Sequence, residues 1–153
     1  MSKQVAIDSS VLVALVDRQD KWHDQARALH AALKAEGANL VYFDCVLNET
    51  ISVMARRAEE QKRSAEFPSL LDELLRQVPE DIVTWISADI QRLFGRIVEL
   101  VRQTGGALNF HDALVVLACQ EMGMAAIVSF DEDFDLVAGL RRAATPDKVK
   151  QML

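Results

Sequence analysis

Short apolar runs alternate with longer helical stretches along the whole chain. The runs lie at residues 4–7, 40–43, 82–86 and 126–129, and a further small strand has room near residues 141–144. Their length and their β-branched and aromatic content favour strands. Strands separated by helices imply βαβ crossovers. The sequence therefore predicts an α/β fold, with a mainly parallel sheet and helices on both of its faces.

The helical stretches are recognised by apolar spacing and by the residues at their ends. Gly37 is placed to end one helix, Asp44 to cap the start of the next, and Thr145 to cap a terminal helix that has Pro146 at its first position. The expected helices cover about residues 11–16, 22–36, a segment after Asp44 that includes Glu49, 64–77, 88–103, 113–122 and the C-terminal residues.

Length and composition indicate one domain that spans residues 1–153. Half of the residues are apolar, which is enough to bury a sizeable core. The formal net charge of −6 and the pI of about 5.0 exclude a broadly basic surface that would coat nucleic acid without discrimination. A local basic groove is compatible with this balance.

The cysteines and the hydropathy pattern limit the compartment. Cys45 and Cys119 lie in apolar helical segments without a short CxxC or Cys/His spacing, so we expect buried, reduced thiols rather than disulfides or zinc ligands. The sequence begins without the pattern of a secretory leader, and no stretch approaches about 18 apolar residues. We expect a soluble, cytoplasmic protein with no membrane partner.

Four acidic residues stand where predicted elements begin or end. Asp8 and Asp131 each follow a strand, Asp112 opens a helix, and Glu49 lies about one turn into another helix. Because parallel sheets place their sites at the carboxyl ends of strands, all four side chains can reach the same crevice. Converging carboxylates need a cation or shared protons to coexist. The pattern therefore predicts a cation site.

The ligand chemistry suggests which cation. Oxygen ligands without a histidine or thiolate partner suit Mg²⁺ or Mn²⁺, and either ion can activate water and neutralise charge on a phosphate. We hypothesise that Asp8, Asp112 and either Asp131 or Asp133 hold the metal. Glu49 would then orient or deprotonate the attacking water.

Four segments together resemble the PIN-domain ribonucleases, and especially the VapC-type toxins of bacterial and archaeal toxin–antitoxin pairs. The likeness runs from end to end and implies a three-layer α/β/α fold, magnesium or manganese, and hydrolysis of RNA phosphodiester bonds. It also implies an antitoxin that holds the enzyme inactive, and a homodimer. The four segments are Asp8-Ser9-Ser10-Val11-Leu12, Asn48-Glu49, His111-Asp112-Ala113-Leu114 and residues 128–135.

The resemblance also implies roles for individual residues. They comprise an acidic quartet, an additional acid in the last motif, and two hydroxyls that support the acids. In this order the matching residues are Asp8, Glu49, Asp112 and Asp131, then Asp133, then Ser10 and Ser129.

Each acid also has a purely structural interpretation. Asp8 could cap the helix that follows it, and Asp112 forms a near capping box with Asn109. Asp133 could be an ordinary turn residue. Glu49 is harder to explain in this way, because its helical neighbours are apolar and a lone buried carboxylate is costly.

Two further questions stay open at this level. Arg56, Arg57, Lys62 and Arg63 form a basic run that suits an RNA backbone, although such a run is usually a solvated helix face. A phosphatase with an aspartyl nucleophile is an alternative function, but Ser10 stands where that class requires a second acid. A second alternative is a PIN-like interaction module that has no catalytic activity.

Overall fold

The computed structural model describes residues 3–153, which form a parallel five-stranded sheet in the order β3-β2-β1-β4-β5. β1 is central, because Ala6 is paired with Val41 of β2 and with Ile127 of β4. The predicted parallel α/β fold is thus confirmed. The strands are β1 (Gln4–Ile7), β2 (Asn39–Phe43), β3 (Val83–Thr84), β4 (Ala126–Val128) and β5 (Arg141–Ala143).

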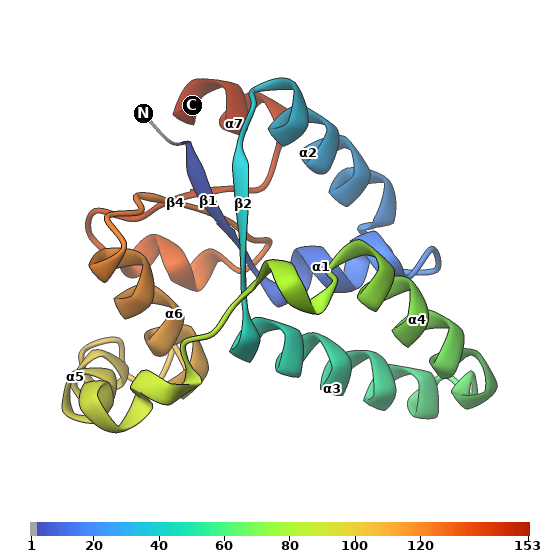
Figure 1. The fold of residues 1–153 in the computed structure, drawn as a ribbon, viewed down its shortest axis with the longest axis horizontal. Coiled ribbons are helices and arrows are strands. Elements are labelled where there is room, and N and C mark those ends of the chain that lie inside the picture. The colour runs from blue at the N-terminus through green and yellow to red at the C-terminus, as the bar shows by residue number, and fades with distance from the viewer. Residues whose placement is uncertain (1–2) are drawn as a thin grey trace.

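Helices cover both faces of the sheet. Figure 1 shows α1, α2 and α4 on one side of β1 and β2, with α5 and α6 on the other side. α1 packs against α2, α3 and α4, and α5 packs against α6. The arrangement is the expected three-layer α/β/α sandwich. The helices in residues 3–153 are α1 (Ser9–Val16), α2 (His23–Ala35), α3 (Asp44–Glu60), α4 (Phe67–Gln77), α5 (Ile90–Gln103), α6 (Phe110–Glu121) and α7 (Pro146–Met152).

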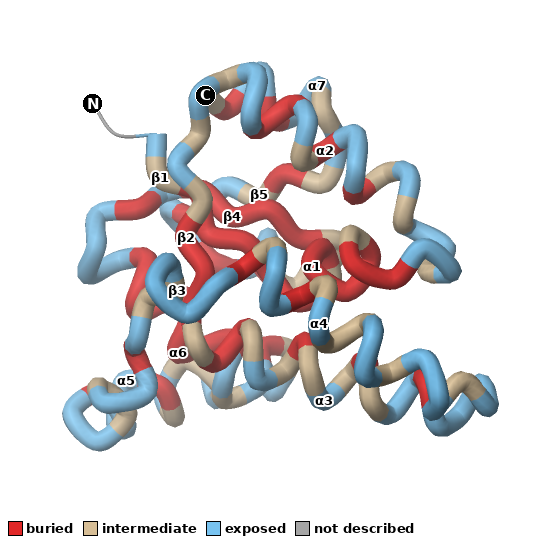
Figure 2. Tube along the Cα trace, turned by 45° about the vertical axis from the view of Figure 1, so that its right-hand side comes forward, coloured by how far each residue is buried: buried red, intermediate tan, exposed pale blue. Residues whose placement is uncertain are grey.

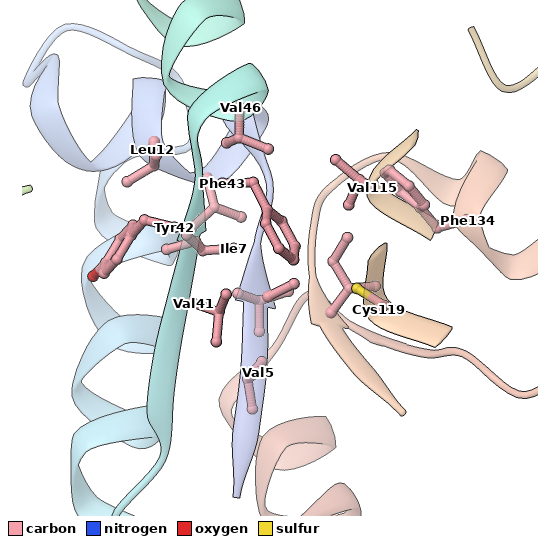
Figure 3. Close-up of a cluster of buried hydrophobic side chains, with 14 of the residues drawn as sticks. Val5, Ile7, Leu12, Val41, Tyr42, Phe43, Val46, Val115, Cys119 and Phe134 are labelled. Carbon is pink, nitrogen blue, oxygen red and sulfur yellow. The ribbon is translucent and has the colours of Figure 1, made fainter. Parts of the chain in front are cut away.

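The central strands β1, β2 and β4 are largely buried, as Figure 2 shows by colour. Successive side chains of a strand point to opposite faces. In β2, Phe43 therefore points towards Val115 and Cys119 of α6, whereas Tyr42 points the other way, to the side of Leu12 (Figure 3). α1 and α6 are apolar around most of their circumference because they lie between the sheet and other helices.

Two helix ends confirm predictions from sequence. The Thr145 hydroxyl accepts a hydrogen bond from the Lys148 amide (3.2 Å) at the start of α7, and Pro146 is the first helical residue. Gly37 follows α2 with φ +67°, and the Ala38 amide donates to the Leu33 carbonyl (3.0 Å). A left-handed residue in this place ends the helix at little steric cost only when it is glycine.

Two predicted element boundaries were wrong. Trp22 does not belong to the helical face of α2 but precedes the helix, and it is 41% exposed. The expected strand at residues 82–86 is reduced to Val83–Thr84, because Glu80–Ile82 forms a 3-10 turn. Trp85 is 64% exposed, so the apolar run that suggested a longer strand does not bury its full length.

Asp44 has a different role from the predicted helix cap. Phe43 occupies the cap position, and Asp44 is the first residue of α3. Its carboxylate accepts hydrogen bonds from the amides of Ile86 (2.8 Å) and Ser87 (3.1 Å) instead. Asp44 thereby ties the segment after β3 to the start of α3.

Both cysteines are buried free thiols, as expected. Burial raises the pKa of each thiol to about 12. No helix within residues 3–153 is long and apolar enough to cross a membrane.

Replacing Asp44 with alanine should lower the free energy of unfolding by about 1 kcal/mol, because the amides of Ile86 and Ser87 lose their acceptor. Burial acts to raise the pKa of Asp44, but the hydrogen bonds from Ser87 and Ile86 outweigh it and lower that pKa. The stabilisation is therefore present above about pH 4 and is lost as the pH falls below it. Urea melts of Asp44→Ala beside Asp81→Ala, an exposed acid of the same region, measure the effect. Equal stability of the two variants would contradict this role.

Candidate metal centre

Three acidic side chains from three elements meet at the carboxyl edge of the sheet. Asp8 directly follows β1, Glu49 lies on α3 after β2, and Asp112 lies in the first turn of α6. Each offers one carboxylate oxygen, and these oxygens all lie within 4.8 Å of one another. They line a cavity of about 220 Å³. Its other lining residues are Ser9, Ser10, Val13, Val53, Arg57, Asn109 and Asp131.

Two serine hydroxyls fix the Asp8 carboxylate. Asp8 Oδ2 accepts hydrogen bonds from Ser129 Oγ (2.5 Å) and Ser10 Oγ (3.0 Å). The hydroxyls in turn accept from the backbone, Ser129 from the Asp131 amide (2.9 Å) and Ser10 from the Phe130 amide (3.1 Å). They thereby join the loop after β4 to the start of α1. Within the described chain the Asp8 side chain caps no helix, so its capping interpretation was wrong.

Asp112 is a helix cap and a cavity residue at once. Its amide donates to Asn109 Oδ1 (2.8 Å), and its own Oδ2 accepts from the Asn109 amide (3.2 Å), which completes the predicted capping box. The capping box holds the carboxylate in one orientation and occupies one of its two oxygens. The structural interpretation is therefore confirmed, and it does not compete with a role at the site.

The surroundings of the three acids disfavour their charged forms. Burial is the main cause, and it raises the pKa of Asp8, Glu49 and Asp112. The charges of Asp8 and Glu49 add to it at Asp112, whose pKa rises to about 7. The charge of Asp8 similarly adds to the effect of burial at Glu49. A divalent cation would offset both burial and repulsion.

The other predicted acids lie further out. Asp131 lines the cavity but is outside the cluster of three, and its Oδ1 accepts a hydrogen bond from the Asp133 amide (2.9 Å) at the start of a 3-10 turn. Asp133 does not line the cavity in the described structure. The neighbouring charge of Asp131 raises the pKa of Asp133. Asp133 thus has the turn geometry that its structural interpretation suggested.

The basic run does not form one groove. Arg57 is the member that lines the cavity, and it forms an ion pair with Asp20 (2.8 Å). Arg63 points elsewhere and binds both oxygens of Asp17 (each 3.0 Å). Arg56 lies within 3.8 Å of Glu60 on the exposed side of α3, and Lys62 follows the end of that helix. Asp17 and Asp20, which set these directions, had no signal in the sequence that linked them to the arginines.

A larger cavity of about 1450 Å³ lies between α1, α2 and α4. Asp17 and Arg63 belong to its lining, as do Tyr42, Arg27 and Glu73. The cluster of three acids does not open into it, so the two cavities are separate features of the described chain.

Without metal, Asp112→Asn should be more stable than the wild type above about pH 7, by roughly 2 kcal/mol, and equally stable near pH 4. The pKa of Asp112 is raised on folding, so the native state loses stability as the pH rises from about 4 to about 7. The amide oxygen of asparagine can still accept the hydrogen bond that the capping box needs. Chemical unfolding in EDTA across this pH range measures the difference. Asn109→Ala is the control, because losing the cap should destabilise the protein at every pH.

Comparison with known proteins identifies the family. The PIN domain family matches residues 5–140, whereas a comparison with curated proteins found no significant match. The crystal structure of VapC20 from Mycobacterium tuberculosis, a toxin that cleaves the sarcin–ricin loop, is similar with a TM-score of 0.66 and 21% identity, covering 88% of this chain and 95% of that one. VapBC2 from Rickettsia felis, bound to a DNA fragment from its promoter, gives a TM-score of 0.63 at 15% identity, covering 92% and 97%. The resemblance inferred from sequence is confirmed: the chain belongs to the PIN domain family.

Proposed function

We propose that the protein is a metal-dependent endoribonuclease that hydrolyses RNA phosphodiester bonds. The observation that carries the proposal is the meeting of Asp8, Glu49 and Asp112 within 4.8 Å, in surroundings that disfavour three negative charges. Membership of the PIN domain family supports it. The similar structure of VapC20, which is described as a sarcin–ricin loop cleaving toxin, supports it further.

The donor atoms fit Mg²⁺ or Mn²⁺. All three are carboxylate oxygens, which these hard cations prefer. Asp8 uses Oδ2 for both serine hydroxyls, and Asp112 uses Oδ2 for the Asn109 amide. Each therefore keeps its other oxygen for an ion. Asp131, at the rim, is the next candidate ligand, and Asp133 is the most remote.

The position of each side chain suggests its role in the reaction. The bound cation would supply charge neutralisation at the scissile phosphate and would lower the pKa of water. Glu49 is the half-buried acid of the cluster, and burial raises its pKa above the ordinary value, which makes it a stronger base for the proton of the attacking water. Ser10 and Ser129 hold Asp8 still, which keeps the reacting groups aligned.

The alternatives gain less support. In an aspartyl phosphatase, the residue two positions after the nucleophile should act as an acid, but the Ser10 hydroxyl donates to Asp8 and accepts from the Phe130 amide. The Ser10 hydroxyl therefore positions Asp8 and does not serve as a second acid. A silent interaction module would have no need to bury three mutually repelling carboxylates.

We also propose that the protein is the toxin of a toxin–antitoxin pair, held inactive by an antitoxin, and that it forms a homodimer. The similar fold of VapC20 and of VapBC2 supports this part of the proposal. A small upstream gene whose product copurifies with this chain and suppresses its cleavage would support the antitoxin. Light scattering of the purified chain decides between monomer and dimer.

Purified protein should cleave labelled RNA in Mn²⁺ or Mg²⁺ and lose this activity in EDTA. Asp112→Asn should lower the rate by at least about 100-fold, because it removes a ligand charge. Asp135→Asn is a matched control, since Asp135 is exposed and pairs with Arg142 outside the cavity. Its rate should equal that of the wild type. Cleavage that survives EDTA, or an inactive wild type, would refute the proposal.

Metal binding can be tested without any activity. Millimolar Mn²⁺ should raise the melting temperature of the wild type, because the ion binds the native state and relieves its repulsion. The increase should disappear in Asp112→Asn and persist in Asp135→Asn. Equal increases in all three proteins would place the ion elsewhere.

A further inference from the structure

Trp22 and Phe130 form an aromatic pair that hydrogen bonds link to residues of the acidic cavity. Trp22, between α1 and α2, stacks on Phe130, with ring centroids 5.5 Å apart and planes inclined by 25°. Phe130 is partly buried and stands between Ser129 and Asp131, whereas Trp22 is 41% exposed. Phe130 thus backs one side of the Trp22 ring, and much of the indole stays in contact with solvent.

A first series of contacts connects this pair to the acids. The Phe130 amide donates to Ser10 Oγ (3.1 Å), and Ser10 Oγ donates to Asp8 Oδ2 (3.0 Å). Phe130 is therefore held by the same hydroxyl that positions Asp8. The aromatic pair and the carboxylate cannot move far apart without breaking this link.

A second, independent series of contacts connects the other member of the pair, Trp22, to the cavity. The Trp22 amide donates to Asp20 Oδ1 (2.8 Å), and Asp20 Oδ2 forms the ion pair with Arg57 (2.8 Å). Arg57 lines the cavity together with Asp8, Glu49 and Asp112. The position of Trp22 is thus fixed relative to the acids from two different elements, α1 and α3.

Positive charge accompanies the aromatic surface. The exposed Lys21 side chain places its Nζ over the Trp22 ring, 5.4 Å from the ring centre. Arg57 is paired with Asp20, whose carboxylate also binds the Trp22 amide. An aromatic face beside cations is the combination that binds single-stranded nucleic acid, because bases stack on the ring while the cations meet the phosphates. A tryptophan kept only for packing would gain more stability from full burial.

We propose that Trp22 is a substrate-positioning residue, on which a nucleobase next to the scissile phosphate stacks. Lys21 then contacts a backbone phosphate of the same strand. The proposal rests on the ribonuclease function, and it requires that the stacked base be unpaired, because a base inside a duplex cannot reach the ring.

The test uses the full chain with Asp112→Asn, which keeps the RNA intact, and Trp85→Phe, which leaves Trp22 as the one tryptophan of the sequence. The probes are single-stranded oligouridylate and oligoadenylate of about 12 nucleotides, and an abasic strand of the same length. The base-containing strands should quench the fluorescence of Trp22. The abasic strand should leave the fluorescence nearly unchanged, and a duplex should quench it much less.

Variants separate stacking from charge. Trp22→Ala and Trp22→Leu should both raise the Kd for the oligonucleotides about 10-fold, whereas Trp22→Phe should restore most of the affinity. Lys21→Ala should reduce the salt dependence of binding by about one counterion. Trp85→Ala is the matched control, an exposed tryptophan outside the cavity lining, and should bind with unchanged Kd. An unchanged Kd in Trp22→Ala, or equal quenching by the abasic strand, would overturn the proposal.

The experiments distinguish failure of the proposed stacking on Trp22 from failure of the proposed ribonuclease function. If wild-type protein cleaves RNA in Mn²⁺ but Trp22→Ala cleaves it with the same KM, the stacking role of Trp22 is wrong and the ribonuclease function is retained. If the oligonucleotides quench Trp22 and Trp22→Ala weakens their binding while the wild type cleaves nothing, the stacking role is retained and the ribonuclease function is wrong.

Discussion

The burial of carboxylates close to one another is the constraint on which this structure depends. Asp8, Glu49 and Asp112 belong to elements fixed by the core, so the acids cannot separate without disturbing β1, α3 or α6. Hydroxyl groups relieve part of the cost at Asp8, and a backbone amide relieves part at Asp112. What remains is an excess of negative potential in a small cavity, which is the property that selects a divalent cation.

The arrangement of the basic side chains also bears on binding at this cavity. The strongest basic candidates from sequence are bound to acids: Arg63 binds Asp17 and Arg57 binds Asp20. With a net charge of −6, the protein has no general attraction for RNA. In the proposed ribonuclease, recognition of RNA would therefore depend on a few local groups near the cavity.

The sequence predicted the positions of those site residues that depend only on the order of strands and helices. Asp8 and Asp131 were placed at the carboxyl edge by the strands before them, and the capping box of Asp112 follows from the spacing to Asn109. The roles of Ser10 and Ser129 came from family resemblance alone. Ser129 is 121 residues from the Asp8 that it holds, whereas Ser10 is only two residues from it. The role of Asp44 was misjudged because its hydrogen-bond partners, Ile86 and Ser87, are distant in the sequence. The ion pairs of Arg57 with Asp20 and of Arg63 with Asp17 likewise join residues far apart in the sequence. Local pattern does not reveal such tertiary contacts.

The strand order has a consequence for biosynthesis. β1 is made first, yet one of its neighbours, β4, is made near the end, and Ser129 and Asp131 follow β4. Chains fold progressively from the N-terminus as they leave the ribosome. Until β4 has emerged, Asp8 lacks the Ser129 hydroxyl that orients it, and α6 has only just delivered Asp112. A partly synthesised chain therefore lacks an ordered acidic centre, and the site is assembled only when translation is nearly complete.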